Sequence, residues 1–254
     1  MSRFFVTDMD ESSEVVSIKG DDFNHIKNVL RYRPGDSITL CDGKGFDYQA
    51  YIEGFEKDRV ILKITDRWKN STEPPIDIVL FQGIPKGDKT DFIIQKTVEL
   101  GVKRIIPLMC ERTVLKFESQ KDMEKKRMRW QRIALEAAKQ CNRGIIPEVS
   151  MPVKFEEALE YAGSLDLAIM PYEKEKERTI KWLINGSLLS NGQAAKSIGV
   201  FIGPEGGFSE KETELASRHE ITMVTLGPRI LRTETAGLAV VAILMYELGD
   251  IGKY

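Results

Sequence analysis

The stretch SIGVFIGPEGGFSEKE, residues 197–212, predicts a β-strand, a glycine-rich turn and the first turn of a helix. The run SIGVFI has no apolar–polar alternation, which is typical of a strand buried on both faces of a parallel sheet. Ser209 and Glu212 have the spacing of a capping box, so a helix is expected to begin there. Glycines let a ligand approach the backbone, and the free N–H groups at a helix start point outward. This stretch therefore predicts an α/β domain with a ligand site at the carboxyl end of a strand.

The chemistry of this glycine turn argues against the common nucleotide-phosphate motifs. No Gly-Lys-Ser/Thr follows it, and the G-x-G spacing of the dinucleotide fingerprint is absent. ATP-dependent and nicotinamide-dependent enzymes are therefore disfavoured. Glu205 would repel a phosphate, but it suits a ligand with hydroxyl groups or a positive charge. A tight turn with a purely structural role is the alternative interpretation.

A second turn of the same construction follows the apolar run ITMVTL at residues 221–226. Gly227 and Pro228 form the turn, and Thr233 or Thr235 is the expected cap of the next helix. The carboxyl ends of neighbouring parallel strands face one crevice, which is where open α/β sheets bind ligands. We expect the two turns to meet there, joined by the strand end at residues 169–171.

The helix after this turn, at about residues 235–248, is apolar and rich in small residues, yet charged residues precede it. Arg229, Arg232 and Glu234 lie directly before it. Gly237 in a helix interior costs about 1 kcal/mol relative to alanine, so we expect a close backbone approach at that point. A buried core helix and a subunit interface both fit this composition, and each can apply to a different face.

Residues 70–75, NSTEPP, form the clearest domain boundary, because they are polar and contain paired prolines. The segment before it predicts a small barrel with one helix at 21–31, its strands lying at 15–18, 37–41, 47–55 and 59–66. The segment after it predicts a parallel sheet covered by helices on both faces, with strands at 76–82, 104–108, 165–170, 197–202 and 221–226. Asp88 is expected to cap the first of these helices and Gly101 to end it.

The composition is that of an ordinary soluble protein, with 42% hydrophobic and 30% charged residues and a net charge of −2. The N-terminus lacks the apolar region of a signal peptide, and the longest apolar run, residues 236–246, is too short to cross a bilayer. Three widely spaced cysteines predict reduced thiols in a cytoplasmic protein. Two histidines in the whole chain disfavour a histidine-rich zinc site.

Basic charge is concentrated between Lys121 and Arg143, where eight basic residues stand against three acidic ones. Such a stripe is typical of a polyanion site, although a solvated helix face has the same composition. Two smaller basic clusters are HIKNVLR at 25–31 and PKGDK at 85–89. In the first of them, Lys27 and Arg31 are expected one turn apart on a helix.

Together these motifs resemble the SPOUT-class RNA methyltransferases, and more narrowly the family that makes 3-methyluridine in the 16S rRNA of the small ribosomal subunit. The matching segments occur in family order over almost the whole chain: R-F-F at 3–5, H-x-x-x-V-L-R at 25–31, Q-G-x-P-K at 82–86, K-x-x-E-L-G at 96–101, F-I-G-P-E-G-G-F-S at 201–209 and L-G-P-R-I-L-R-T-E-T-A at 226–236. Lys139 and Cys141 depart from the family's Glu-Gln-Ser-x-Arg pattern, whereas Gln140 and Arg143 match it.

The resemblance implies an N-terminal PUA-like, RNA-binding β-barrel at residues 1–70 and a C-terminal SPOUT methyltransferase domain at residues 76–254. The C-terminal domain would be an α/β domain with a deep trefoil knot. The resemblance also implies S-adenosylmethionine as the cofactor, 16S rRNA within the small ribosomal subunit as the substrate, and a homodimer whose interface includes the C-terminal helix. It implies neither a metal ion nor a membrane attachment.

The same resemblance supplies the expected contact residues. Cofactor contacts are expected from Met170, Pro171, Ile202, Gly203, Pro204, Glu205, Gly206, Gly207, Leu226, Gly227, Ile230, Leu231, Thr235 and Ala236. RNA contacts are expected from Arg3, His25, Lys27, Arg31, Arg33, Lys86, Arg112, Arg129, Arg132, Gln140 and Arg143.

Methylation of uracil at N3 requires that the N3 proton leave, so the site needs a base or cations that stabilise the uracil anion. We expect Arg232 to stabilise the developing charge, and Glu234 to orient it or to accept the proton. A purely structural Arg232–Glu234 ion pair is the competing interpretation of the glutamate. Two other classes of function stay open: a SPOUT enzyme acting on another base or on a ribose 2′-hydroxyl, and a non-catalytic RNA-binding or ribosome-assembly factor.

Overall fold

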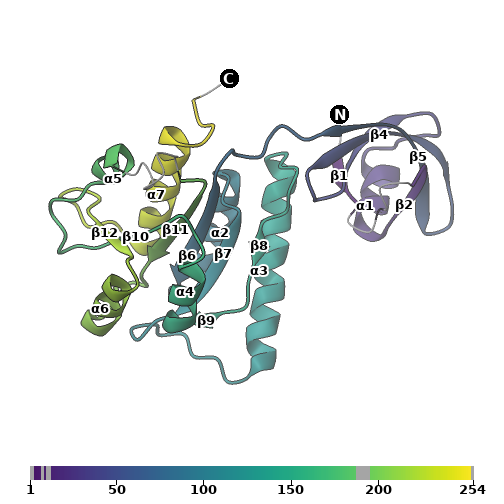
Figure 1. The fold of residues 1–254 in the computed structure, drawn as a ribbon. Helices are drawn as coiled ribbons and strands as arrows, with labels where there is room; N and C mark the ends of the chain where they lie inside the picture. The colour runs from purple at the N-terminus through teal and green to yellow at the C-terminus, as the bar shows by residue number, and fades with distance from the viewer. Residues whose placement is uncertain (1–2, 7–8, 10–12, 187–194, 253–254) are drawn as a thin grey trace. The chain divides into compact units, whose positions relative to one another are not determined.

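The computed structural model describes residues 3–6, 9, 13–186 and 195–252 (Figure 1). The chain forms two compact units. The N-terminal unit contains residues 1–73 together with 138–146, and the C-terminal unit contains residues 74–137 and 147–254. The division after residue 73 falls within the NSTEPP segment. The return of residues 138–146 to the N-terminal unit has no counterpart in the sequence-based prediction.

The N-terminal unit is built on a five-stranded sheet with the order β1-β3-β4-β5-β2. Its strands are β1 (Arg3–Phe5), β2 (Val15–Lys19), β3 (Ser37–Cys41), β4 (Phe46–Phe55) and β5 (Arg59–Lys69). The pair β1–β3 is parallel and the other neighbours are antiparallel. Alternate residues of β4 and β5, such as Ala50, Ile52 and Leu62, are buried and form a core with Phe23 and Ile26. The predicted strands of this region are confirmed.

The helix expected at residues 21–31 differs in the structure. An α-helix, α1 (Gly20–Asn24), continues as a π-helical turn, η1 (His25–Val29). The Leu30 N–H donates to the His25 carbonyl five residues back, and Arg31 adopts a left-handed φ of 56°. Lys27 and Arg31 are therefore not one turn apart on a regular helix, and that prediction was wrong.

Residues 138–146 are fixed to the N-terminal unit by buried charges. The Arg143 guanidinium pairs with the Glu73 carboxylate, with Nη2 to Oε2 at 2.7 Å, and its side chain is only 5% exposed. Arg3 pairs with Asp47 at 2.6 Å and donates a second hydrogen bond to the Arg143 carbonyl at 2.7 Å. Arg3 and Arg143 thus hold the unit together, which is a structural role that the expectation of RNA contact did not include.

The C-terminal unit contains a parallel sheet with the order β12-β10-β11-β6-β7-β8, and β9 also pairs with β7. Its strands are β6 (Asp77–Gly83), β7 (Arg104–Met109), β8 (Glu148–Val149), β9 (Val153–Lys154), β10 (Leu167–Pro171), β11 (Ser197–Ile202) and β12 (Thr222–Val224). The strands without alternation are buried on both faces, since all residues of β6 after Asp77 are buried. The predicted parallel sheet is confirmed.

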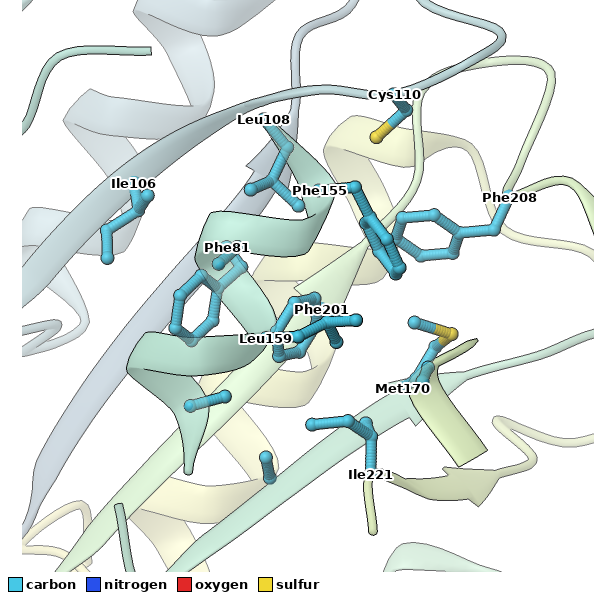
Figure 2. Packing of buried hydrophobic residues seen from close by; sticks show 14 of the residues in the cluster. Phe81, Ile106, Leu108, Cys110, Phe155, Leu159, Met170, Phe201, Phe208 and Ile221 are labelled. Atoms are coloured by element: carbon cyan, nitrogen blue, oxygen red, sulfur yellow. The ribbon is translucent and has the colours of Figure 1, made fainter. Parts of the chain in front are cut away.

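Helices cover both faces of this sheet: α2 (Lys89–Glu99), α3 (Gln120–Gln140), α4 (Phe155–Ala162), α5 (Ile180–Gly186), α6 (Glu210–Arg218) and α7 (Thr233–Glu247). On one face, the rings of Phe81 and Phe201 stack with centroids 4.2 Å apart, and Phe155 and Leu159 of α4 pack against them (Figure 2). On the other face, α7 packs against β6, β11 and α2. No helix in the described ranges is both long and apolar enough to span a membrane.

The helix ends test the local sequence signals. The Ser209–Glu212 capping box is present. Helix α2 ends at Glu99, and Gly101, the residue after its cap Leu100, has the left-handed φ of 97° that is typical of a helix end. Asp88 occupies the cap position of α2, but its side chain makes no capping hydrogen bond. Neither threonine caps α7, because the helix begins at Thr233 and its cap residue is Arg232.

Candidate functional site

The loops that follow β10, β11 and β12 surround a pocket of about 890 Å³. These strands are neighbours and run parallel, so their carboxyl ends lie at one edge of the sheet. The lining comes from residues 171–179, 202–208 and 225–233, with Lys89 and Ala236 added. The pocket therefore lies at the strand ends where the sequence places a ligand site.

Glycines allow the backbones around this pocket to approach closely. A Cβ on Gly83 would lie 2.5 Å from the Pro204 nitrogen, and a Cβ on Gly203 would lie 3.0 Å from the Gly207 backbone. Gly207 itself has a φ of 65°, which favours glycine. The GPEGG loop is thus packed against the end of β6 and folded back on itself, so its shape depends on the absence of side chains.

The start of α7 is fixed to the same loop by a buried hydrogen-bond network. The Thr233 hydroxyl donates to the Gly203 carbonyl at 2.6 Å, and Gln82 Nε2 donates to Thr233 Oγ1 at 2.9 Å. Gln82 Oε1 is buried without a hydrogen bond from the described residues, and it would lie 3.3 Å from a Cβ on Gly237. Side chains of β6 and β11, and not another backbone, therefore lie closest to Gly237, so the expected backbone approach is not what the structure shows there.

The three charged residues before and at the start of α7 have different surroundings. Arg229 and Arg232 are exposed and line the pocket. The Arg232 side chain makes no hydrogen bond or ion pair with any residue that the structure describes. Glu234 instead lies beside Lys89, with Oε2 and Nζ 3.4 Å apart. The Arg232–Glu234 ion pair of the competing interpretation is absent from the described contacts, and the cation beside this carboxylate is Lys89 at the start of α2.

Lys89 also contacts the GPEGG loop, through Glu205. Its Nζ donates to Glu205 Oε1 at 3.0 Å, and Glu205 accepts the Lys86 backbone N–H at 3.1 Å. The hydrogen bond to Glu205 raises the pKa of Lys89, and the charges of Glu205 and Glu234 raise it further. Partial burial raises the pKa of Glu205, but the hydrogen bonds from Lys89, from its own backbone N–H and from Lys86 outweigh that effect and hold this pKa below its usual value.

Most of the predicted cofactor contacts line the pocket: Pro171, Ile202, Gly203, Pro204, Glu205, Gly207, Leu226, Gly227, Ile230, Leu231 and Ala236. Three of the predicted residues do not. Met170 is fully buried in the core between sheet and helices (Figure 2), Thr235 points to solvent, and Gly206 is exposed beside the Arg112 side chain.

Several lining residues were not among the predicted contacts, among them Tyr172, Glu173, Phe208 and Thr225. Lys89 belongs to the PKGDK segment, which the sequence places as a basic loop at a strand's carboxyl end in the crevice, and it does line the pocket. Its two carboxylate partners are more than a hundred residues away along the chain, so no local spacing could have predicted these ion pairs.

The predicted RNA-contact residues fall into two groups. Arg3, which is partly buried, and Arg143, which is buried, make the ion pairs described above. Arg129 pairs with Asp91, and Arg112 donates to the Gly206 carbonyl at 2.7 Å, although both remain exposed. The others are exposed side chains: His25, Lys27, Arg31, Arg33, Lys86, Arg132 and Gln140. Lys27 lies over the rings of Phe23 and Phe55, with its Nζ 5.2 and 5.9 Å from their centroids.

Comparison with known proteins gives a consistent result. Residues 72–245 match the model of the RNA methyltransferase domain, and residues 18–65 match that of the RNA methyltransferase PUA domain. The ribosomal RNA small subunit methyltransferase E of Bacillus subtilis is 34% identical, over 97% of each chain. The protein of the same name from Mesomycoplasma hyopneumoniae is 32% identical over 94% of this chain and 96% of its own.

Solved structures agree in fold over the full length. A ribosomal RNA small subunit methyltransferase E from Neisseria gonorrhoeae, crystallised with S-adenosylmethionine, is 34% identical, with a TM-score of 0.84 over 98% of this chain and 99% of that one. A putative methyltransferase from Legionella pneumophila, also bound to S-adenosylmethionine, is 31% identical, with a TM-score of 0.84 over 98% of each chain. The fold is therefore α/β with a PUA-like domain, and the chain belongs to the ribosomal RNA small subunit methyltransferase E family.

Proposed function

We propose that this protein transfers a methyl group from S-adenosylmethionine to N3 of a uridine in the 16S rRNA of the small ribosomal subunit, giving 3-methyluridine. The observation that carries the proposal is the pocket at the ends of β10, β11 and β12 in a chain of this family. Arg232 lies exposed at its wall, without a partner among the described residues. Relatives crystallised with S-adenosylmethionine support the choice of cofactor.

The pocket of this chain fits that cofactor in size and chemistry. Its volume of about 890 Å³ lies within the range of about 300–1,000 Å³ that is usual for small-molecule sites. Apolar side chains such as Ile202, Leu226 and Leu231 offer contacts to an adenine ring. Carboxylates at Glu173 and Glu205 suit the positive charge and hydroxyl groups of the ligand, and no phosphate-binding motif is present. When bound there, S-adenosylmethionine supplies an electrophilic methyl group.

Arg232 lines the pocket, and Glu234 follows the lining residue Thr233 without being part of the lining itself; together they have the chemistry that N3 methylation requires. Arg232 is exposed and keeps its donors available for the uracil oxygens, on which negative charge develops as the N3 proton leaves. Glu234 carries a carboxylate at the start of α7, where it can accept that proton. Lys89, and not Arg232, is the cation beside Glu234, so the two residues are available for separate roles.

We propose RNA contacts from the exposed predicted residues of each unit, and not from the ion-paired Arg3 and Arg143. In the N-terminal unit these residues are His25, Lys27, Arg31, Arg33 and Gln140; in the C-terminal unit they are Lys86, Arg112, Arg129 and Arg132. Cationic and hydrogen-bonding side chains of this kind bind RNA through phosphates, and their contribution falls as salt concentration rises.

We further propose the finer architecture that the family implies: a PUA-like β-barrel at residues 1–70, and a deep trefoil knot within a methyltransferase domain at 76–254. The close approach of Gly83 to Pro204 and the hydrogen bond from Thr233 to Gly203 support tight threading of these loops. We also propose a homodimer through α7, on which Ile243 and Tyr246 are 41% and 63% exposed. Because the proposed substrate is the small ribosomal subunit, we propose the cytoplasm as the place of action.

One experiment tests the activity. Small subunits and naked 16S rRNA from cells that lack this methylation are incubated with the protein and labelled S-adenosylmethionine, and the modified nucleoside is identified by mass spectrometry. Labelled 3-methyluridine supports the proposal. A different methylated nucleoside would assign another target to the same pocket. RNA binding without cofactor binding or methyl incorporation would contradict the proposal and favour a ribosome-assembly factor.

A further inference from the structure

Through ion pairs with Glu205 and Glu234, Lys89 links three segments of the C-terminal unit, each of which follows a different strand. It is the first residue of α2, after β6, while Glu205 lies in the loop after β11 and Glu234 lies in the first turn of α7, after β12. The Lys89 Nζ is 3.0 Å from Glu205 Oε1 and 3.4 Å from Glu234 Oε2. One ammonium group therefore compensates two carboxylates from distant parts of the chain, at the wall of the pocket that Lys89 itself lines.

The two carboxylates differ in how well they are satisfied. Glu205 accepts a hydrogen bond from Lys89 and further hydrogen bonds from the Lys86 backbone N–H, at 3.1 and 3.3 Å. Glu234 Oε2 is buried and has no hydrogen bond from the described residues, because the Lys89 ammonium at 3.4 Å is not aligned to donate one. A buried carboxylate oxygen without a hydrogen bond is costly, so nearby positive charge is its remaining compensation.

We infer that Lys89 is a positioning residue for methyl transfer, which holds the Glu234 carboxylate in place so that it accepts the N3 proton of the uracil. The inference rests on the proposed function. The N3–H bond breaks and an O–H bond forms on Glu234, while the electron pair left on N3 forms the new N3–CH3 bond. The S–CH3 bond of the cofactor breaks with its electron pair left on sulfur, and Glu234 later gives the proton to water. Lys89 stays protonated throughout.

The charge arrangement favours this role over that of a brace for the GPEGG loop. Glu205 keeps its Lys86 backbone hydrogen bonds without Lys89, and the loop is also fixed by Thr233 and by the glycine contacts. Glu234 Oε2 has no such second partner among the described residues. Removal of the Lys89 ammonium therefore affects Glu234 more than it affects the loop.

The first test needs no activity and uses thermal unfolding of the free protein. Lys89→Met is expected to lower the midpoint by about 2 °C, because Glu234 loses the cation that compensates its buried oxygen. Adding Glu234→Gln should restore most of that loss, because a neutral amide needs no counter-charge, whereas adding Glu205→Gln should not. These variants form two double-mutant cycles, Lys89 with Glu234 and Lys89 with Glu205. Midpoint changes that are simply additive in both cycles would contradict the inference.

The second test separates chemistry from cofactor binding. With saturating RNA and cofactor, Lys89→Met is expected to slow single-turnover methyl transfer about 100-fold, the size typical of losing general-base catalysis. The cofactor Kd, measured by calorimetry, should change less than about threefold, where tenfold would correspond to 1.4 kcal/mol. Lys89→Met/Glu234→Gln should be no slower than Glu234→Gln alone, because residues that act as a unit are not additive.

Lys96→Met is the matched control. It removes another ammonium group of α2, which pairs with the Glu99 carboxylate at 2.8 Å. It should keep both the rate and the cofactor Kd. If Lys89→Met weakens cofactor binding and regains full rate at saturation, Lys89 is a loop brace and the inference is wrong. If the wild-type protein transfers no methyl group to RNA, the proposed function fails, and the unfolding cycles still decide whether Lys89 compensates Glu234.

Discussion

Arg143 in the N-terminal unit and Arg232 in the C-terminal unit are the same residue type, and both match motifs of the family. Arg143 is buried, with its guanidinium paired to Glu73. Arg232 is exposed at the wall of the pocket, with no partner among the described side chains. A motif match therefore identifies a position but not its role. The partners and burial distinguish an arginine that holds a fold together from one that is free to bind a ligand.

The largest expected effect is that of replacing Arg232, the arginine at the pocket wall. Arg232→Ala should slow single-turnover methyl transfer by about 100- to 1,000-fold, because it removes a preorganised donor for developing negative charge. The unfolding midpoint should stay unchanged, since the side chain has no described partner to lose. Arg218→Ala on α6, where the pair with Glu214 is 4.0 Å long, is the control for general loss of charge. Full activity of Arg232→Ala would remove Arg232 from catalysis.

The second effect tests the buried arginine. Arg143→Met should lower the free energy of unfolding by about 3 kcal/mol, because Glu73 would keep a partly buried charge without its partner. Arg59→Met in the same unit breaks an exposed pair with Glu56 and should cost less than about 1 kcal/mol. Chemical denaturation measures both. A stable Arg143→Met protein with weakened RNA binding would show that Arg143 is a ligand-binding residue and would break the comparison.

A smaller effect concerns the backbone packing below the pocket. Gly83→Ala should cost about 2 kcal/mol, because its Cβ would lie 2.5 Å from the Pro204 nitrogen and force the loop to move. Gly54→Ala is the matched control, since nothing lies within 4 Å of its Cβ, and it should stay within about 0.5 kcal/mol of wild type. Denaturation curves that show equal costs would contradict the described packing of the GPEGG loop.

The smallest effect concerns an exposed arginine of the basic helix. Arg132→Ala should weaken RNA binding about threefold and lower the salt slope of log K by about 1, as expected for one phosphate contact. Binding titrations at several salt concentrations measure both quantities, with Arg218→Ala as the control. An unchanged slope would mean that this part of α3 is a solvated face and not an RNA surface.

The sequence predicts those parts of this molecule that depend on local signals. The alternation of apolar strands and helices identified the parallel sheet, and the Ser209–Glu212 spacing identified a real capping box. The glycines at 203, 206 and 207 correctly marked a turn at a strand end. In each case the physical cause lies within a few residues, so a linear pattern contains it.

What the sequence could not predict depends on distant partners. In the π-helical turn at His25–Val29, the Leu30 N–H donates to the carbonyl five residues back and not four. No amino-acid pattern in this segment indicates that change. Thr233 looked like a helix cap, but its hydroxyl bonds to Gly203, which a local pattern cannot reveal. Glu234 likewise pairs with Lys89 and not with the nearby Arg232. Arg3 and Arg143 were expected as RNA contacts from the family resemblance. Their ion pairs could not be predicted, because the acceptors Asp47 and Glu73 are far away in the sequence.

The return of residues 138–146 to the N-terminal unit has a consequence for synthesis on the ribosome. Arg143 and its carbonyl complete the contacts of Glu73 and Arg3, so the first 73 residues cannot finish folding when they emerge. At about 5–20 residues per second, the nascent chain must wait about 4–15 s for the rest of this unit. During that interval the Glu73 carboxylate and the Arg3 guanidinium lack part of their partners. The N-terminal unit is therefore expected to become protease-resistant only after residue 146 has left the ribosomal exit tunnel.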